Sequence, residues 1–374
     1  MIYLDNASTT RPCEEAVQAA EEIMREDFFN PSALYSAGAR VRGRIESARE
    51  TVAGKLGAAA NEVVFTSGAT EANNWAVNCG YKNRKGNAVV SLVEHPSVYE
   101  TAVALKNKGL DVRFVRPGAD GCVHADDLAR VADEKTAFVS ILHVSNETGA
   151  VNDIAAVAKR VKQTNPRTVF LSDGVQAFGK LPVRLTRDID FYSVSAHKIG
   201  GVRGVAGLFR KKGARLSPYI FGGGQENGLR SGTENTFAIK QFEFAAKKKF
   251  SSLKEDFERI RSYNLAVRQG LDKTIFRVLS SENASPYILS VSARGLRGEV
   301  LLHMLDDAGV MVGTGSACSS KNRYSRVILA CGLDERPADG VLRISFAATT
   351  TLQETEQAIG IINSCAAALA ERTK

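Results

Sequence analysis

The sequence predicts a large α/β domain with a doubly wound, mostly parallel sheet, and a smaller α+β domain. Three observations predict it: short apolar runs recur with helix-like stretches between them, several runs are apolar on both faces, and the pattern changes beyond about residue 251. Strands that are apolar on both faces are typical of a parallel sheet covered by helices. At 374 residues and 44% hydrophobic content, the chain can bury cores for both units. We expect the large domain at residues 15–250 and the small domain at 1–14 and 251–374.

Seven apolar runs predict the strands of the large sheet: 62–67, 87–93, 111–117, 136–144, 168–173, 190–196 and 204–210. Between them, "IAAVAKRVKQT" (154–164) has apolar residues at three- and four-residue spacing, which predicts a helix. The small domain begins with a charged helical stretch at 253–274. A strand at 287–293, a helix at 299–308, a strand at 340–347 and a helix from about Leu352 follow.

Composition narrows the class of protein. The net charge of +8 comes from dispersed basic residues, and "AAKKKF" (245–250) resembles one solvated helix face, so we expect no direct nucleic-acid binding. No apolar run reaches the length of a membrane span, and "MIYLDNASTTRP" lacks the pattern of a secretory signal, so we expect a soluble, cytoplasmic protein. The six cysteines contain no C-x-x-C pair and the five histidines do not cluster, so we expect no metal site.

Polar residues follow the predicted strands, where ligands bind in doubly wound sheets. After the first strand, Gly68, Ala69 and Thr70 open a helix whose N–H groups would favour a phosphate, although an ordinary capped helix start explains this stretch equally well. Later strands are followed by further polar residues: His95; Asn146 and Glu147; Asp173 and Gln176; Ser195, His197 and Lys198. Several such positions on one sheet edge indicate a site.

The residue types at this edge point to one cofactor. Lys198, beside a glycine-rich turn, can form a Schiff base with an aldehyde. Asp173 could pair with a pyridinium nitrogen, so that the ring withdraws electrons. Thr70, Ser195 and His197 would donate to a phosphate, and His95 could stack on the ring. Together these groups describe a site for pyridoxal 5'-phosphate.

The chain also resembles a known family, the cysteine desulfurases, which are fold-type I pyridoxal-phosphate-dependent transferases of the class V aminotransferase group. The resemblance covers essentially the whole chain. It rests on an ordered set of motifs: "YLDNASTT", "FTSGATEANN", "EHPSV", "SNETG", "SDGVQAFGK", "SAHKIGG", "GGGQENGLRSGTEN", "GSACSS" and "LRISF".

The resemblance implies a role for each candidate residue. Lys198 would hold the cofactor and move the substrate Cα proton, and Asp173 would pair with the ring nitrogen. His95 would stack on the ring and act as an acid or base. The other cofactor-binding residues would be Gln176 and Asn146 near the ring oxygen, and Ala69, Thr70, Ser195 and His197 at the phosphate.

The resemblance also implies a second subunit and a substrate pocket. Thr233 would complete the neighbouring subunit's phosphate site, which makes the protein a homodimer. Arg343 would bind the substrate carboxylate as a bidentate fork, and Asn6 and Asn146 would contribute to the substrate pocket. Beside Arg343 the sequence departs from the family pattern: "AATTT" follows "RISF", where many relatives have a Gly-Arg pair.

Cys318 lies in "MVGTGSACSSKNRYS", a stretch rich in turn and linker residues. It matches the persulfide-forming cysteine of the family, and its "GSAC" context resembles the branch with a longer, mobile catalytic loop.

The implied activity converts L-cysteine to L-alanine and passes the sulfur from Cys318 to an acceptor protein, an iron–sulfur scaffold or a tRNA thiolase. The alternatives are a selenocysteine lyase, another class V aminotransferase or lyase, and a non-catalytic sulfur-assembly partner.

Overall fold

A computed structural model of the chain describes residues 1–81, 85–314 and 324–373. Its main sheet has seven strands in the order β2-β8-β7-β6-β5-β3-β4. All seven predicted strands are present: β2 (Val63–Thr66), β3 (Asn87–Ser91), β4 (Val112–Val115), β5 (Thr136–Ser140), β6 (Val169–Asp173), β7 (Phe191–Ser195) and β8 (Ala206–Arg210). Strand β8 runs antiparallel to both of its neighbours, while the other pairs are parallel. The predicted mostly parallel α/β sheet is therefore confirmed.

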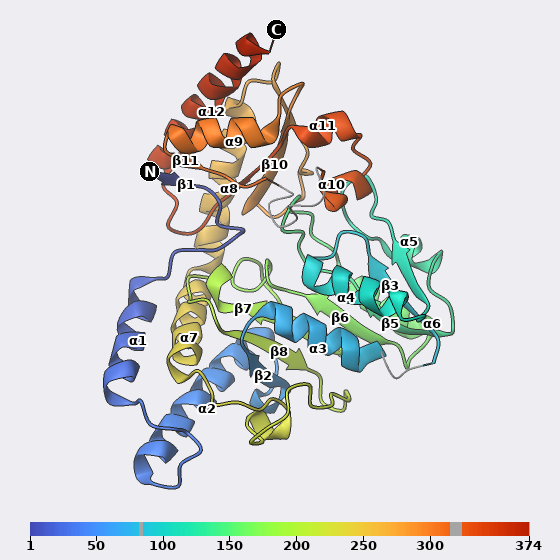
Figure 1. Cartoon of the computed structure of the whole chain (residues 1–374), viewed down its shortest axis with the longest axis vertical. Helices are drawn as coiled ribbons and strands as arrows, with labels where there is room; N and C mark the ends of the chain where they lie inside the picture. The colour runs from blue at the N-terminus through green and yellow to red at the C-terminus, as the bar shows by residue number, and fades with distance from the viewer. Residues whose placement is uncertain (82–84, 315–323, 374) are drawn as a thin grey trace.

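Helices cover both faces of this sheet, as a doubly wound fold requires (Figure 1). On one face, α3 (Ala69–Tyr81) and α4 (Pro96–Asn107) bury Trp75 and Leu105 against the strands. The opposite face is covered by α2 (Ser36–Leu56), α6 (Ile154–Thr164) and α7 (Thr236–Ser251). Two further helices, α1 (Glu14–Glu26) and α5 (Ala125–Ala129), pack on α7 and α6 respectively.

The stretch 245–250 on α7 is not one solvated face. Ala245 and Ala246 are fully buried in the core, and Lys249 lies 3.7 Å from Asp256 with little exposure. Lys247 and Lys248 do face solvent. Three consecutive lysines on a helix point in directions about 100° apart, so they cannot all lie on one face.

A second core lies at the end of the molecule that carries both termini (Figure 1). Strand β10 (Ile288–Ala293) pairs antiparallel with β9 (Phe276–Val278) and β12 (Val341–Ser345). Strand β1 (Ile2–Tyr3) pairs with β11 (Val310–Met311). The helices of this region are α8 (Leu253–Gly270), α9 (Gly298–Asp307), α10 (Arg326–Ala330), α11 (Glu335–Asp339) and α12 (Leu352–Arg372).

Buried residues of this second core come from both ends of the chain, from Ile2 to Ala7 and from Ile260 to Leu369. We retain a division into residues 15–250 and residues 1–14 with 251–374 as a proposal, because the two sets of packed side chains support it. Among the helices that the structure describes, none is long and apolar enough to cross a membrane.

A buried ion pair holds the loop that leads to α7. The Arg49 guanidinium donates to both carboxylate oxygens of Glu226, at 2.6 and 2.8 Å, and the Phe65 N–H donates to the same carboxylate at 2.8 Å. Glu226 and Asn227 both have left-handed backbone conformations, with φ of 50° and 57°. Non-glycine residues adopt this conformation only where surrounding contacts fix it. The ion pair therefore fixes the course of residues 222–235.

We expect Arg49→Met to destabilise the fold by about 3–5 kcal/mol, because it leaves the Glu226 carboxylate buried and unpaired. The measurement is the midpoint of urea unfolding followed by circular dichroism. The matched control is Arg25→Met, whose guanidinium pairs with Glu21 on the surface, with side-chain exposures of 75% and 59%. That control should cost about 0.5 kcal/mol or less. Equal midpoints for the two variants would contradict the role given to the buried pair.

Candidate functional site

The carboxyl ends of six of the seven main strands meet at one edge of the sheet. Strand β2 has the same direction as β7, because both lie antiparallel to β8, which separates them. Asp173 ends β6 and Ser195 ends β7, while Ala69 begins α3 just after β2. The structure therefore brings most of the predicted residues to the same edge, including His95, Thr70 and Lys198.

Lys198 lies in the short 3-10 turn η2 (Ala196–Lys198) directly after β7. Its ammonium donates to the main-chain carbonyls of Ala7 and Ser8, each at 2.6 Å. The neighbouring His197 is held by the same N-terminal segment, since its Nδ1 lies 3.2 Å from Thr9 Oγ1. The N-terminal segment thus covers the lysine from outside the sheet.

Asp173 and His95 are joined by a buried chain of hydrogen bonds. Asn73, on α3, donates from Nδ2 to Asp173 Oδ2 at 2.8 Å and to Ser97 Oγ at 2.9 Å. Ser97 Oγ lies 2.8 Å from His95 Nδ1, which also accepts from the Ser97 N–H at 3.2 Å. Since Nδ1 accepts, a neutral His95 carries its hydrogen on Nε2. The chain fixes the orientation of the imidazole relative to the carboxylate.

His95 and the adjacent Glu94 are both uncharged around Asp173. Burial lowers the pKa of His95, so its imidazole is neutral near pH 7. Burial and the nearby Asp173 charge raise the pKa of Glu94 to about 8. Glu94 accepts from Ser140 Oγ at 3.1 Å and is fully buried. Glu94 is therefore protonated at neutral pH.

Gln176 lies in the turn after β6, almost fully buried. Its Nε2 donates to the Ala7 carbonyl at 2.9 Å, and its Oε1 accepts from Lys180 at 2.7 Å. Gln176 and Lys198 therefore share one acceptor, the Ala7 oxygen, which brings the side chains of two strand ends together.

The predicted phosphate end lies at the start of α3. The first N–H groups of a helix have no acceptor within the helix, and α3 places those of Ala69 and Thr70 at the sheet edge. Ser195 is buried at the end of β7. Burial and the charge of Lys198 lower the pKa of His197 to about 4. The donors at this end are thus neutral groups and a helix terminus, and a helix terminus favours a bound phosphate.

Arg343, on β12, is buried and already has several acceptors. Nη2 donates to Asp5 Oδ1 at 2.7 Å and to Ser8 Oγ at 2.6 Å, while Nη1 donates to the Asn146 carbonyl at 3.0 Å. Its Nε is buried with no partner among the described residues. Asn6 is also buried, and its amide donates to the Tyr3 and Ser345 carbonyls. The Asn6 side chain thus fastens the N-terminal segment to β12.

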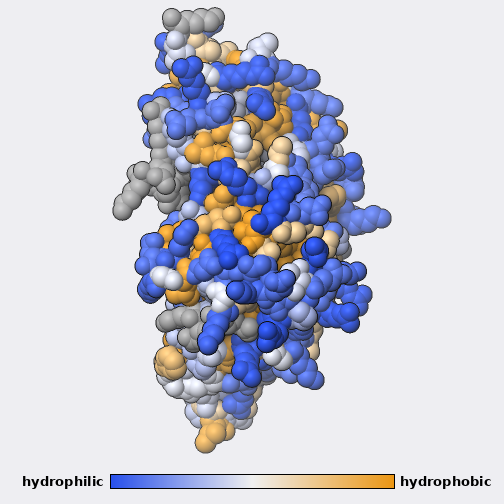
Figure 2. Space-filling view, turned by 90° about the vertical axis from the view of Figure 1, so that its right-hand side faces the viewer, coloured by the Kyte–Doolittle hydropathy of each residue, from blue (hydrophilic) through white to orange (hydrophobic). Residues whose placement is uncertain are grey.

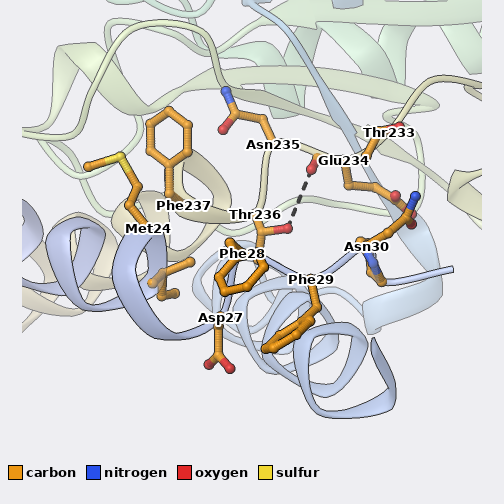
Figure 3. Close-up of a pocket in the computed structure, with 12 residues that line it drawn as sticks. Met24, Asp27, Phe28, Phe29, Asn30, Thr233, Glu234, Asn235, Thr236 and Phe237 are labelled. Carbon is orange, nitrogen blue, oxygen red and sulfur yellow. Dashed lines mark hydrogen bonds between the residues drawn. The ribbon is translucent and has the colours of Figure 1, made fainter. Parts of the chain in front are cut away.

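Thr233 does not join this cluster within one chain. It is exposed and lines a pocket of about 340 Å³ formed by residues 23–31 and 233–237 (Figure 3). Met24, Phe28, Phe29 and Phe237 give that pocket its apolar lining. Among the described residues that line it, Thr233 is the only one predicted for the site.

Cys318 lies outside the described residues, but both described flanks are fixed at the site. On one side, Gly313 exchanges main-chain hydrogen bonds of 2.9 and 2.7 Å with Arg343. On the other, Ser325 Oγ donates to the Glu147 carboxylate, and Arg326 Nη2 donates to the Glu94 carbonyl at 2.7 Å. Burial raises the pKa of Glu147 to about 7. The chain thus leaves and re-enters the described structure beside the candidate site.

These groups fit pyridoxal phosphate. Lys198 supplies an amine, Asp173 a buried carboxylate, and α3 a helix N-terminus for the phosphate. The buried Asn73 Oδ1 has no partner among the described residues. An acceptor beside Asp173 is therefore available to a donor of a bound group. The sequence analysis missed Asn73, Ser97, Glu94 and Lys180. All four lie within the motifs quoted. Asn73 and Glu94 have partners that are distant in sequence, while the contacts of Ser97 with His95 and of Lys180 with Gln176 are local and show their significance only through burial.

Comparisons with known proteins agree with this arrangement. The family model described as aminotransferase class-V matches residues 2–357. A "NifS/IcsS protein homolog" from Lactobacillus delbrueckii subsp. bulgaricus is 36% identical over 372 residues, covering 96% of this chain and 95% of the relative. A "Cysteine desulfurase IscS" from Dictyoglomus turgidum is 32% identical, covering 96% of this chain and 93% of the relative.

Solved structures give the same result. A structure named "NIFS-LIKE PROTEIN" superposes with a TM-score of 0.93 at 33% identity, covering 98% of this chain and all of the other. A second, "SspA in complex with cysteine", gives a TM-score of 0.82 at 29% identity, covering 94% of this chain and 100% of the other. The chain therefore belongs to the class V aminotransferase family, within its pyridoxal-phosphate-dependent cysteine desulfurases.

Proposed function

We propose that this enzyme takes the sulfur of L-cysteine onto Cys318 and passes it to an acceptor protein, with Lys198, Asp173 and His95 as the central residues. The observation that carries the proposal is the buried chain Asp173–Asn73–Ser97–His95, which lies at the sheet edge that also holds Lys198. When bound, pyridoxal phosphate supplies an electron sink for the bonds broken at the substrate.

The chain's own residues would divide the remaining work. Lys198 Nζ would take the proton from the substrate Cα and return it. Asp173 would hold a proton on the cofactor ring nitrogen, and His95, neutral and carrying its hydrogen on Nε2, would donate that hydrogen at the substrate end. Arg343 would hold the substrate carboxylate, and Gln176, Asn146, Ser195, His197, Ala69 and Thr70 would fix the cofactor.

Sulfur transfer would take place at Cys318. The thiolate is the nucleophile in such reactions. It would attack the substrate sulfur, the carbon–sulfur bond would break, and a sulfur–sulfur bond would form on Cys318. Alanine would leave with the proton that the Cys318 thiol gave up. The similar structure named "SspA in complex with cysteine" supports cysteine as the substrate. The acceptor would be an iron–sulfur scaffold or a tRNA thiolase.

A homodimer would complete each site through Thr233. Exposed apolar side chains lie on the α1–α2 connection and before α7: Phe28 is 72% exposed, Leu34 98% and Phe221 82%. Phe28 lines the same pocket as Thr233. Figure 2 shows an apolar tip at the lower end, which Figure 1 identifies as the α1–α2 connection. Exposed apolar patches of this kind are typical of subunit interfaces. A second copy covering them would bring Thr233 to the partner's α3 terminus.

The Lys198→Ala variant should lose the visible absorption band of the bound cofactor, because it removes the amine that directly follows β7 and that would hold the cofactor. The measurement is the absorption spectrum after reconstitution with pyridoxal phosphate. Lys248→Ala is the control, since this lysine lies exposed on α7 and pairs with Glu15. An unchanged band in Lys198→Ala would show that another lysine holds the cofactor.

The Cys318→Ala variant should keep cofactor absorbance and cysteine binding but lose persulfide formation, measured by mass spectrometry after incubation with L-cysteine. Cys365→Ala, on α12, serves as control and should form the persulfide normally. Full sulfide release by Cys318→Ala without a reductant would rule out this cysteine. Alanine production that requires a keto-acid acceptor would favour an aminotransferase instead.

The shared site can be tested by mixing subunits. Thr233→Ala should weaken cofactor binding by about 10- to 100-fold, the effect of one hydrogen bond to a charged group. A heterodimer of one Thr233→Ala subunit and one Lys198→Ala subunit should regain one intact site, and hence half of the wild-type absorbance at wild-type affinity. If both residues act within one subunit, the heterodimer will have no site of wild-type affinity.

A further inference from the structure

Lys180 is a buried lysine that contacts no acidic side chain among the residues that the structure describes. It is 3% exposed, and the charged groups that act on it are Lys198 on η2, Lys249 on α7 and Arg343 on β12, all of them cations. The ring of Tyr287 lies 5.8 Å from its Nζ. Burial and these neighbours lower the pKa of Lys180 well below its ordinary value. Burying an amine costs free energy unless its hydrogen bonds are made, so the side-chain hydrogen bond that Lys180 makes within the described part of the chain is informative.

That contact is with Gln176. Lys180 Nζ donates to Gln176 Oε1 at 2.7 Å, and Gln176 Nε2 donates to the Ala7 carbonyl at 2.9 Å. The same carbonyl accepts from Lys198 Nζ at 2.6 Å. An amine can donate whether or not it is charged. The Lys180 donor and the Ala7 acceptor therefore favour the same orientation of the amide, with its N–H₂ group on the Lys198 side.

We propose that Lys180 is a positioning residue for the reaction, which holds the Gln176 amide with its N–H₂ group toward the Lys198 nitrogen. Without Lys180, Gln176 Oε1 would be buried without a partner, and the amide would lose its fixed orientation. Lys180 does not touch the reacting atoms and acts through Gln176. The inference rests on the proposed function, because it concerns the nitrogen that would hold the cofactor.

The orientation of this amide has a spectroscopic consequence. N–H groups and any positive charge beside the Lys198 nitrogen disfavour a proton on that nitrogen once it is bound to the cofactor. Lys180→Met removes the donor while keeping the length and apolar stem of the side chain. The pH midpoint of the visible absorption change should therefore rise in this variant, by about half to one pH unit.

The experiment is a pH titration of the visible spectrum of the reconstituted enzyme, without substrate, for Lys180→Met, Gln176→Ala and the double variant. If Lys180 acts through Gln176, the double variant will have the midpoint of Gln176→Ala alone. Additive shifts, or an unchanged midpoint in Lys180→Met, would overturn the proposal. Lys180→Arg serves as a second test should Lys180→Met not fold. This variant keeps a donor and should retain the wild-type midpoint. A shift in Lys180→Arg as large as that of Gln176→Ala would overturn the proposal.

Lys249→Met is the matched control. Lys249 is also buried and acts on Lys180, but it lies 3.7 Å from Asp256 and does not contact Gln176 among the described residues. Its loss should change stability without moving the midpoint. A wild-type enzyme with no visible band would refute the proposed function itself, whereas a normal band that is insensitive to Lys180 refutes only this inference.

Discussion

The carbonyl oxygen of Ala7 is the point on which the site depends. It accepts from Lys198 Nζ at 2.6 Å and from Gln176 Nε2 at 2.9 Å, while the Ala7 N–H donates to Ser345 Oγ at 2.8 Å. One residue thus connects the turn after β7, the turn after β6 and strand β12. Because both donors converge on one oxygen, the position of Ala7 sets the position of both side chains. The position of the lysine is therefore set by the N-terminal segment as well as by the main sheet.

The same N-terminal segment connects the second core to the main sheet. Asp5 pairs with Arg343, and Ala7 and Asn6 are held by Ser345, all on the β12 side. Three residues further along, Thr10 donates to the His197 carbonyl from both its N–H and its hydroxyl, each at 2.9 Å. Residues 5–10 therefore form a short strap of polar contacts between Arg343 and the Lys198 turn. Both sets of contacts are hydrogen bonds or ion pairs, so their geometry is directional.

The sequence predicted the strands and the sheet edge, because apolar runs and strand ends depend on local pattern. It could not predict that "GVAGLFR" (204–210) runs antiparallel, since burial on both faces carries no direction. Nor could it predict Asn73, whose partners Ser97 and Asp173 lie 24 and 100 residues away. Lys180 ends the motif "SDGVQAFGK", and nothing in that motif shows that the lysine is buried with its ammonium on Gln176. Polar partners of this kind depend on tertiary packing, which periodicity does not record.

Arg343, which we propose as the ligand of the substrate carboxylate, already has most of its donors in use. A guanidinium has five N–H donors, and here both Nη2 hydrogens are used by Asp5 and Ser8 and one Nη1 hydrogen by the Asn146 carbonyl. The two that are left, on Nε and Nη1, do not lie on one edge of the planar group. A carboxylate can therefore bind as a bidentate fork only if it takes an Nη2 hydrogen from Asp5 or Ser8. Exchange of one carboxylate for another preserves the charge balance around a buried arginine, which makes Asp5 the group that a substrate carboxylate would replace.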